Sequence, residues 1–119
     1  MAYLEPTGKQ LKSFSTMPSN GPIVMVNLLK FKASGGRESY AQYAAVAGRL
    51  VNKIGGRVIH QGEFLAAVIG DGDWDEVLLA EYPSREAFFR MIGWEEYQAV
   101  VHFRSEALAD SRLWATRPE

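Results

Sequence analysis

Apolar positions along this chain follow two different periods, and each period predicts a different kind of element. Residues 23–31 (IVMVNLLKF) are apolar almost throughout and predict a β-strand with Asn27 near its middle. Residues 38–54 place apolar side chains three and four positions apart, which is typical of an amphipathic helix that ends at Gly55-Gly56. Residues 57–70 and 76–83 predict two strands joined by the turn GDGDWD, with a bulge or bend expected at Gly62.

Both ends of the chain add further elements. Thr7 and Gln10 have capping-box spacing and predict a short helix over residues 7–16, followed by the loop MPSNGP. Ser84 is a good N-cap for the next helix, residues 94–109 continue in helical spacing, and residues 111–117 predict a last strand. The order after the leading helix is β-α-β-β-α-β, which predicts an α+β, ferredoxin-like fold with a four-stranded antiparallel sheet. We expect one domain over residues 1–119, in which residues 1–21 form an N-terminal helical extension and loop.

The predicted strands are apolar on both of their faces. In the first strand, Val24, Val26 and Leu28 lie on one face and Met25 and Leu29 on the other, and the second and third strands show the same pattern. A sheet with helices on one side normally alternates apolar and polar residues. One chain covers one face only, and an open apolar face would exceed the few hundred Å² that monomers tolerate. We therefore predict a homodimer that packs sheet on sheet, with a cavity between or beside the sheets.

Charge and cysteine content narrow the possible functions. The 13 Lys and Arg residues against 14 Asp and Glu give a net charge of -1, which argues against nucleic-acid binding. The absence of Cys excludes disulfides and thiolate chemistry, and two His residues leave little for a metal or a haem, so we expect no metal and no cofactor. No secretory signal or membrane span is visible, which predicts a soluble, cytoplasmic protein.

Several segments together resemble one known family. They are VNLLKF (26–31), Tyr40, Tyr43, GGR (55–57), VIGDGDWDEVLLAEYPSREAF (68–88) and EEYQ (95–98). In these segments the chain resembles the domain of unknown function 1330 family, nearly throughout from residue 22. That family belongs to the dimeric α/β-barrel superfamily, so the resemblance implies a ferredoxin-like protomer and a dimer whose sheets form a barrel. Superfamily relatives include cofactor-independent monooxygenases, lactone isomerases and haem-dependent enzymes, but a shared fold does not transfer chemistry.

Three polar residues interrupt the apolar strands. Asn27 shares a strand face with Met25 and Leu29, where it either bonds to neighbouring backbone or orients a ligand in the cavity. His60, placed by simple alternation on the face of Val58, is a candidate general base or a structural histidine. Glu81 is a candidate for proton transfer if it is buried, and otherwise pairs with Arg57 or Arg85 at the strand end.

Three further residues complete the candidate site. Arg104 is a candidate anchor for a ligand carboxylate, which it would hold through two parallel hydrogen bonds. The alternative is an ion pair at the surface with Glu106 or Asp110. His102 lies off the apolar stripe of its helix, where a solvated position is the default. Trp74, at the hairpin turn, more often packs a core or an interface than stacks on a ligand.

Two hypotheses about function follow from these residues. The first is a small dimeric barrel that binds an apolar or aromatic small molecule and catalyses a cofactor-independent proton transfer, isomerisation or monooxygenation. The alternative is a non-enzymatic ligand-binding or dimerisation module, in which the polar residues are structural. The sequence has no Ser-His-Asp arrangement or paired-acid motif, so it does not decide whether the protein is an enzyme.

Overall fold

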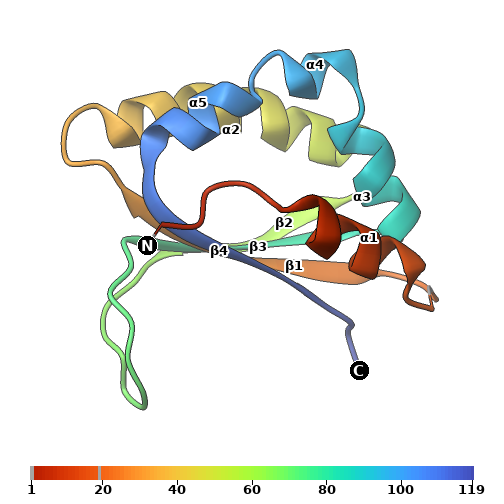
Figure 1. Ribbon diagram of the computed structural model, residues 1–119, viewed down its shortest axis with the longest axis horizontal. Coiled ribbons are helices and arrows are strands. Elements are labelled where there is room, and N and C mark those ends of the chain that lie inside the picture. Colours follow the sequence, from red (N-terminus) through yellow and green to blue (C-terminus); the bar gives the residue numbers. More distant parts are fainter. Residues whose placement is uncertain (1, 19) are drawn as a thin grey trace.

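Four antiparallel strands form a sheet, and helices lie against one of its faces (Figure 1). The computed structural model describes residues 2–18 and 20–119. Its elements are α1 (Gly8–Thr16), β1 (Ile23–Phe31), α2 (Gly36–Lys53), β2 (Arg57–Glu63), β3 (Glu76–Tyr82), α3 (Arg85–Ile92), α4 (Glu95–Gln98), α5 (Val101–Ala107) and β4 (Leu108–Thr116). The strand order is β2-β3-β1-β4, so the predicted ferredoxin-like arrangement is confirmed. Within the described residues, no helix is long and apolar enough to cross a membrane.

The central strand β1 divides its side chains between the two faces of the sheet. Met25, Asn27 and Leu29 are buried under the helices, whereas Val24 and Val26 are only partly covered on the other face. The second face, which we call the open face, carries no helix (Figure 1). Its apolar positions in β1 and β3 are Val24, Val26, Leu28, Val77 and Leu79. The structure therefore has the uncovered apolar face that the strand pattern predicts.

Helices α2 and α5 approach each other closely at Gly36, the first residue of α2. A Cβ atom at this position would lie 2.7 Å from the backbone oxygen of Ala107, so only glycine fits. The backbone N–H of Lys32 donates to the same oxygen at 2.8 Å, and the Ser39 hydroxyl donates to the Phe103 oxygen at 2.9 Å. These contacts fix α5 over the start of α2, and they place Arg104 in the buried layer.

The bulge in β2 lies three residues before its predicted position. The pairing of β2 with β3 shifts register between Val58 and His60, whereas Gly62 pairs regularly with Val77. The prediction of a bulge at Gly62 is therefore wrong, because the extra residue, Ile59, is accommodated near the start of the strand. A bulge of one residue turns every later side chain to the other face. His60 consequently shares the open face rather than the face of Val58, which the alternation had predicted.

The predicted strand over residues 57–70 is also too long, since β2 ends at Glu63. Residues 64–75, which we call the arm, form an irregular loop that hangs beside the sheet on the side away from the helices (Figure 1). Their apolar alternation does not make a strand, because a strand requires a hydrogen-bonded neighbour. Leu65, Val68 and Ile69 of the arm are 86%, 91% and 95% exposed.

The N-terminal segment crosses from β4 to α5 before α1 begins. Its residues 3–5, which we call the strap, have no regular secondary structure. The Tyr3 N–H donates to the Asp110 carboxylate at 2.9 Å, and the Ser111 hydroxyl donates to the Tyr3 oxygen at 2.5 Å. The predicted capping box on Thr7 is present and starts α1. The N-terminal extension is thus part of the folded body.

Candidate functional site

Four tyrosines interact with one another between the helices and the sheet, and the charge of Arg104 acts on three of them. Helix α2 supplies Tyr40 and Tyr43, α4 supplies Tyr97, and β3 supplies Tyr82. The hydroxyl oxygens of Tyr43 and Tyr97 are 3.0 Å apart and share a hydrogen bond. Ring centroids are 5.4 Å apart for Tyr40 and Tyr43, and 5.9 Å for Tyr43 and Tyr97. We refer to these five residues as the tyrosine–arginine cluster.

Burial favours the neutral form of the Tyr40, Tyr43 and Tyr82 phenols. It raises the pKa of Tyr40 to about 12, and it raises the pKa values of Tyr43 and Tyr82 well above the ordinary value of 10.0. The Arg104 guanidinium acts in the opposite direction and lowers the pKa of all three groups, although burial outweighs it. At neutral pH these side chains can therefore donate hydrogen bonds, but they cannot act as bases.

Arg104 is a buried cation with an incomplete set of hydrogen bonds. The residue is 9% exposed, its Nη1 donates to the backbone oxygen of Leu4 at 3.2 Å, and its Nη2 is buried without a partner in the described chain. The surface alternative does not occur, because Asp110 pairs with Arg112 at 2.8 Å and no ion pair among the described residues joins Arg104 to Glu106. A buried guanidinium without a counter-ion is costly.

Asn27 lies in the same buried layer as the cluster, on the face of β1 that the helices cover. Its exposed fraction is 9%, and its Nδ2 donates to the Leu78 oxygen of the neighbouring strand at 3.3 Å. The sequence left open whether Asn27 bonds to neighbouring backbone or to a ligand, and in the structure it bonds to backbone. This bond accounts for one polar group of the amide, which agrees with the rule that buried polar groups are hydrogen-bonded.

His60 and Glu81 lie on the open face, opposite Asn27. His60 is exposed, and its ring lies so close to Gly62 that a Cβ atom there would be 3.0 Å from Nε2. Glu81 forms an ion pair with Arg57, with Oε1 and Nε 3.0 Å apart, as one of the two sequence alternatives stated. Within one protomer, the sheet separates these two residues from Asn27. The structure therefore does not bring the three polar strand residues together.

Trp74 and His102 lie outside the cluster as well. Trp74, at the base of the arm, is partly buried, and its ring is 5.2 Å from the guanidinium carbon of Arg112. Tyr3 lies against the same guanidinium at 4.7 Å. His102 is exposed on α5, with its ring centroid 4.1 Å from that of Phe103.

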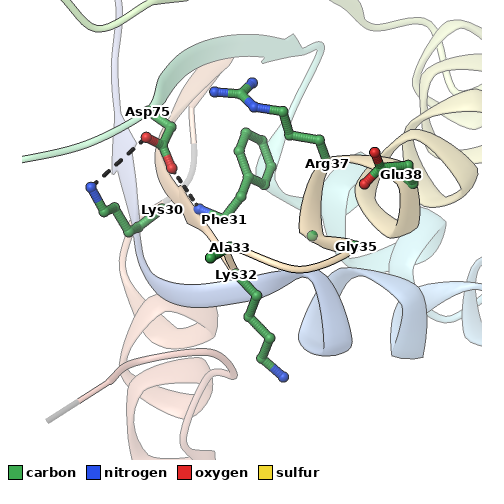
Figure 2. Close-up of a pocket in the computed structure, with 9 residues that line it drawn as sticks. Lys30, Phe31, Lys32, Ala33, Gly35, Arg37, Glu38 and Asp75 are labelled. Carbon is green, nitrogen blue, oxygen red and sulfur yellow. Dashed lines mark hydrogen bonds and ion pairs between the residues drawn. The ribbon is translucent and has the colours of Figure 1, made fainter.

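A surface pocket of about 410 Å³ opens where β1 meets the start of α2 (Figure 2). Its lining includes three positive side chains and two negative ones, which are Lys30, Lys32, Arg37, Glu38 and Asp75. The Asp75 carboxylate lies 3.8 Å from the Lys30 ammonium and accepts the Phe31 N–H at 2.8 Å. Figure 2 shows Arg37 lying over the Phe31 ring, at 4.8 Å from its centroid. None of the six residues predicted from the sequence lines this pocket, and we place the candidate site in the cluster instead.

Four tyrosines of the cluster were not recognised as site residues from the sequence. Tyr40, Tyr43 and Tyr97 fit the apolar stripes of their helices, and Tyr82 belongs to an apolar strand. Their hydroxyl groups could have identified them as candidates, because each tyrosine brings a polar group into a face that must be buried. Arg104 is the one predicted residue that the fold places with them.

Comparison with known proteins supports a family but no activity. A family model described as "Domain of unknown function (DUF1330)" matches residues 30–115. The RPA0582 protein of unknown function from Rhodopseudomonas palustris is 35% identical, with a TM-score of 0.90 over 100% of this chain and 98% of that chain. Its methylated form gives the same identity and a TM-score of 0.92, over 99% and 96% of the two chains. A comparison with curated proteins gave no match.

More distant structures share the fold alone. A dabb family protein with a ferredoxin-like fold from Mesorhizobium loti is 17% identical, with a TM-score of 0.61 over 84% of this chain and 99% of that one. A dimeric ferredoxin-like protein of unknown function from Thermobifida fusca is 13% identical, with a TM-score of 0.58 over 83% and 92%. These likenesses agree with the ferredoxin-like topology of the sheet.

Proposed function

This chain belongs to the domain of unknown function 1330 family, and from that premise we propose that it is a homodimeric α/β-barrel protein that binds a small aromatic or apolar molecule between its helices and its sheet. The observation that carries the proposal is the tyrosine–arginine cluster. There, Arg104 Nη2 is a buried donor without a partner in the described chain, and the surrounding interior is otherwise largely apolar. Ligand sites combine apolar walls with a few polar groups in this way.

The chemistry of the cluster favours recognition of an oxygen atom on the ligand. Neutral phenols and a guanidinium all donate hydrogen bonds, and each can point a donor at a carbonyl or carboxylate oxygen. In a low-dielectric interior such bonds hold a ligand firmly. His60 and Glu81 lie across the sheet, so we assign them no role at this site. We therefore propose binding as the function, and the same donors would stabilise negative charge on an oxygen in a cofactor-independent isomerisation or proton transfer.

The proposed homodimer rests on the open face and the arm. Val26 and Leu79 are paired at the centre of the open face. Trp114 lies beside Val26 on β4, at the edge of this face, and is 54% exposed. The Arg57–Glu81 and Asp110–Arg112 ion pairs flank this apolar area. The arm hangs on the same side of the sheet (Figure 1). A second copy packed sheet on sheet would cover the open face and contact the arm at the same time.

Nuclear magnetic resonance with a neutral aromatic probe tests the binding proposal. We expect phenylacetamide to shift backbone amide signals of α2, α4 and α5 around the cluster. Removing one hydroxyl of the shared hydrogen bond by Tyr43→Phe should weaken this binding severalfold, because a donor is lost where water is excluded. Ser13→Ala, which removes an exposed hydroxyl from α1, is the control and should leave binding unchanged. Shifts confined to the open face, or none at all, would contradict the proposed site.

A further inference from the structure

The two terminal nitrogens of the buried Arg104 side chain differ, because Nη1 is hydrogen-bonded and Nη2 has no partner in the described chain. Its Nη1 bonds to a neutral peptide oxygen of Leu4, and its Nη2 has no partner in the described chain. The guanidinium therefore meets a single neutral acceptor, whereas its shape suits the two oxygens of a carboxylate. Tyr40, Tyr43 and Tyr82, on which the Arg104 charge acts, have raised pKa values, so they hold their protons at neutral pH and do not supply the missing negative charge.

The acceptor belongs to the strap, which hydrogen bonds to α5 and β4 hold against the folded body. Leu4 packs its side chain against a buried apolar cluster formed by Leu29, Phe31, Tyr40, Ala107 and Leu108. The strap belongs to no helix or strand, and side chains of α5 and β4 make the hydrogen bonds that hold it. Leu4 thus packs an isobutyl group against the residues of this apolar cluster, which we call the slot, and its carbonyl oxygen accepts a hydrogen bond from Arg104. A small branched carboxylic acid combines the same two groups, a branched hydrocarbon and an acceptor oxygen.

We propose that Arg104 binds the carboxylate of a small apolar carboxylic acid, which displaces Leu4 and takes its place in the slot. The ligand's hydrocarbon part fills the volume of the leucine side chain, and its two oxygens accept from Nη1 and Nη2. The strap then acts as an internal competitor that closes the site when no ligand is present. This inference rests on the proposed function and specifies its ligand class.

The charge at the slot favours a monocarboxylate over a dianion. Arg104 is the one cation of the tyrosine–arginine cluster, and the slot walls are apolar. A single carboxylate neutralises the one positive charge of Arg104, whereas a dianion would leave its second negative charge buried without a counter-ion. The ligand must also release the strap, so its affinity is the direct affinity reduced by the cost of opening.

Two probes that differ only in charge test this inference. Isocaproate has the carbon skeleton of a leucine side chain with its Cα and carbonyl carbon, and isocaproamide is its neutral counterpart. Isothermal titration calorimetry of the wild-type protein should give an affinity for isocaproate that is at least about tenfold higher, a difference of about 1.4 kcal/mol. Equal affinities would overturn the carboxylate assignment, and this comparison requires no variant.

Variants separate the roles of the arginine and the strap. Arg104→Met should abolish the preference for isocaproate, while Arg49→Met, a change of an exposed arginine on α2, should leave it intact. Leu4→Ala should raise the affinity for isocaproate severalfold, because the competing side chain is removed. An unchanged or lower affinity in Leu4→Ala would show that the strap does not occupy the ligand position.

The outcomes also distinguish this inference from the function on which it rests. If phenylacetamide binds at the cluster but isocaproate has no advantage over isocaproamide, the small-molecule site stands and the carboxylate assignment fails. If isocaproate fails to bind both the wild-type protein and Leu4→Ala, the assignment also fails. The phenylacetamide experiment then decides the proposed function by itself.

Discussion

Tyr40, Tyr43 and Tyr82 occupy positions where an apolar residue would also fit, and their hydroxyl groups make the difference. Each ring adds to the packing between helix and sheet, while each hydroxyl lies within the electrostatic range of the Arg104 guanidinium. The sequence predicted that these positions are buried, from the stripe on α2 and the apolar strand β3. It did not predict that the Arg104 charge acts on all three, because the fold brings these residues together from distant parts of the chain.

Alkaline titration tests the buried state of these tyrosines. The pKa of Tyr40 is raised from 10.0 to about 12 in the folded protein, and those of Tyr43 and Tyr82 are raised as well. A raised pKa means that the folded state holds the proton more tightly than the unfolded state. The resulting stability is present below about pH 10 and is lost as the pH rises through the folded values.

Ultraviolet absorbance of tyrosinate measures this directly. In the folded protein we expect a late step that is absent in urea, and the Tyr40→Phe variant should reduce the amplitude of that step. If all tyrosines of the folded protein ionised over the same pH range as in urea, the buried cluster would be contradicted.

At the scale of elements, hydrophobic periodicity predicted the β-α-β-β-α-β order, and it failed in two definable places. A bulge at Ile59 turned His60 to the open face, because side-chain direction depends on a local pairing that periodicity does not record. Residues 64–70 alternate like a strand but lie in the arm. The burial of Arg104 depended on the strap, which contacts α5 from about 100 residues away, and no local pattern contains that information.

The close approach of α2 and α5 gives a prediction at the same scale. Gly36→Ala should destabilise the protein by about 1–3 kcal/mol, since its Cβ would be 2.7 Å from the Ala107 oxygen and the helices would have to separate. Gly48→Ala in the same helix is the matched control, because a Cβ there meets nothing within 4 Å. We expect this control to stabilise the protein by about 0.5–1 kcal/mol.

Urea denaturation of the two variants measures both effects. Similar free energies of unfolding for Gly36→Ala and Gly48→Ala would contradict the described contact between α2 and α5.

For the whole molecule, two apolar surfaces remain uncovered on one side, the open face and the arm. The sequence predicted the first from strands that are apolar on both faces, and the structure adds the second. Three aliphatic side chains of the arm are almost fully exposed, which is expensive unless a partner covers them. Both surfaces point away from the helices (Figure 1), so one partner can cover both.

The arm can be tested separately from the sheet. A Val68→Asp/Ile69→Asp double variant should weaken the proposed dimer by at least about tenfold, because two charges would enter an apolar contact. Ala45→Asp, on the exposed side of α2, is the matched control and should leave assembly unchanged. Analytical ultracentrifugation provides the dissociation constants. Equal dissociation constants for the double variant and the wild type would exclude the arm from the interface.

The central claim is that a second copy of this chain covers the open face and completes a barrel. Native mass spectrometry of the purified protein at micromolar concentration tests it most directly. The account predicts a dimer, and a small-molecule mass retained on it would further support a ligand site. A monomer at that concentration would leave the apolar open face without a partner and would contradict the account.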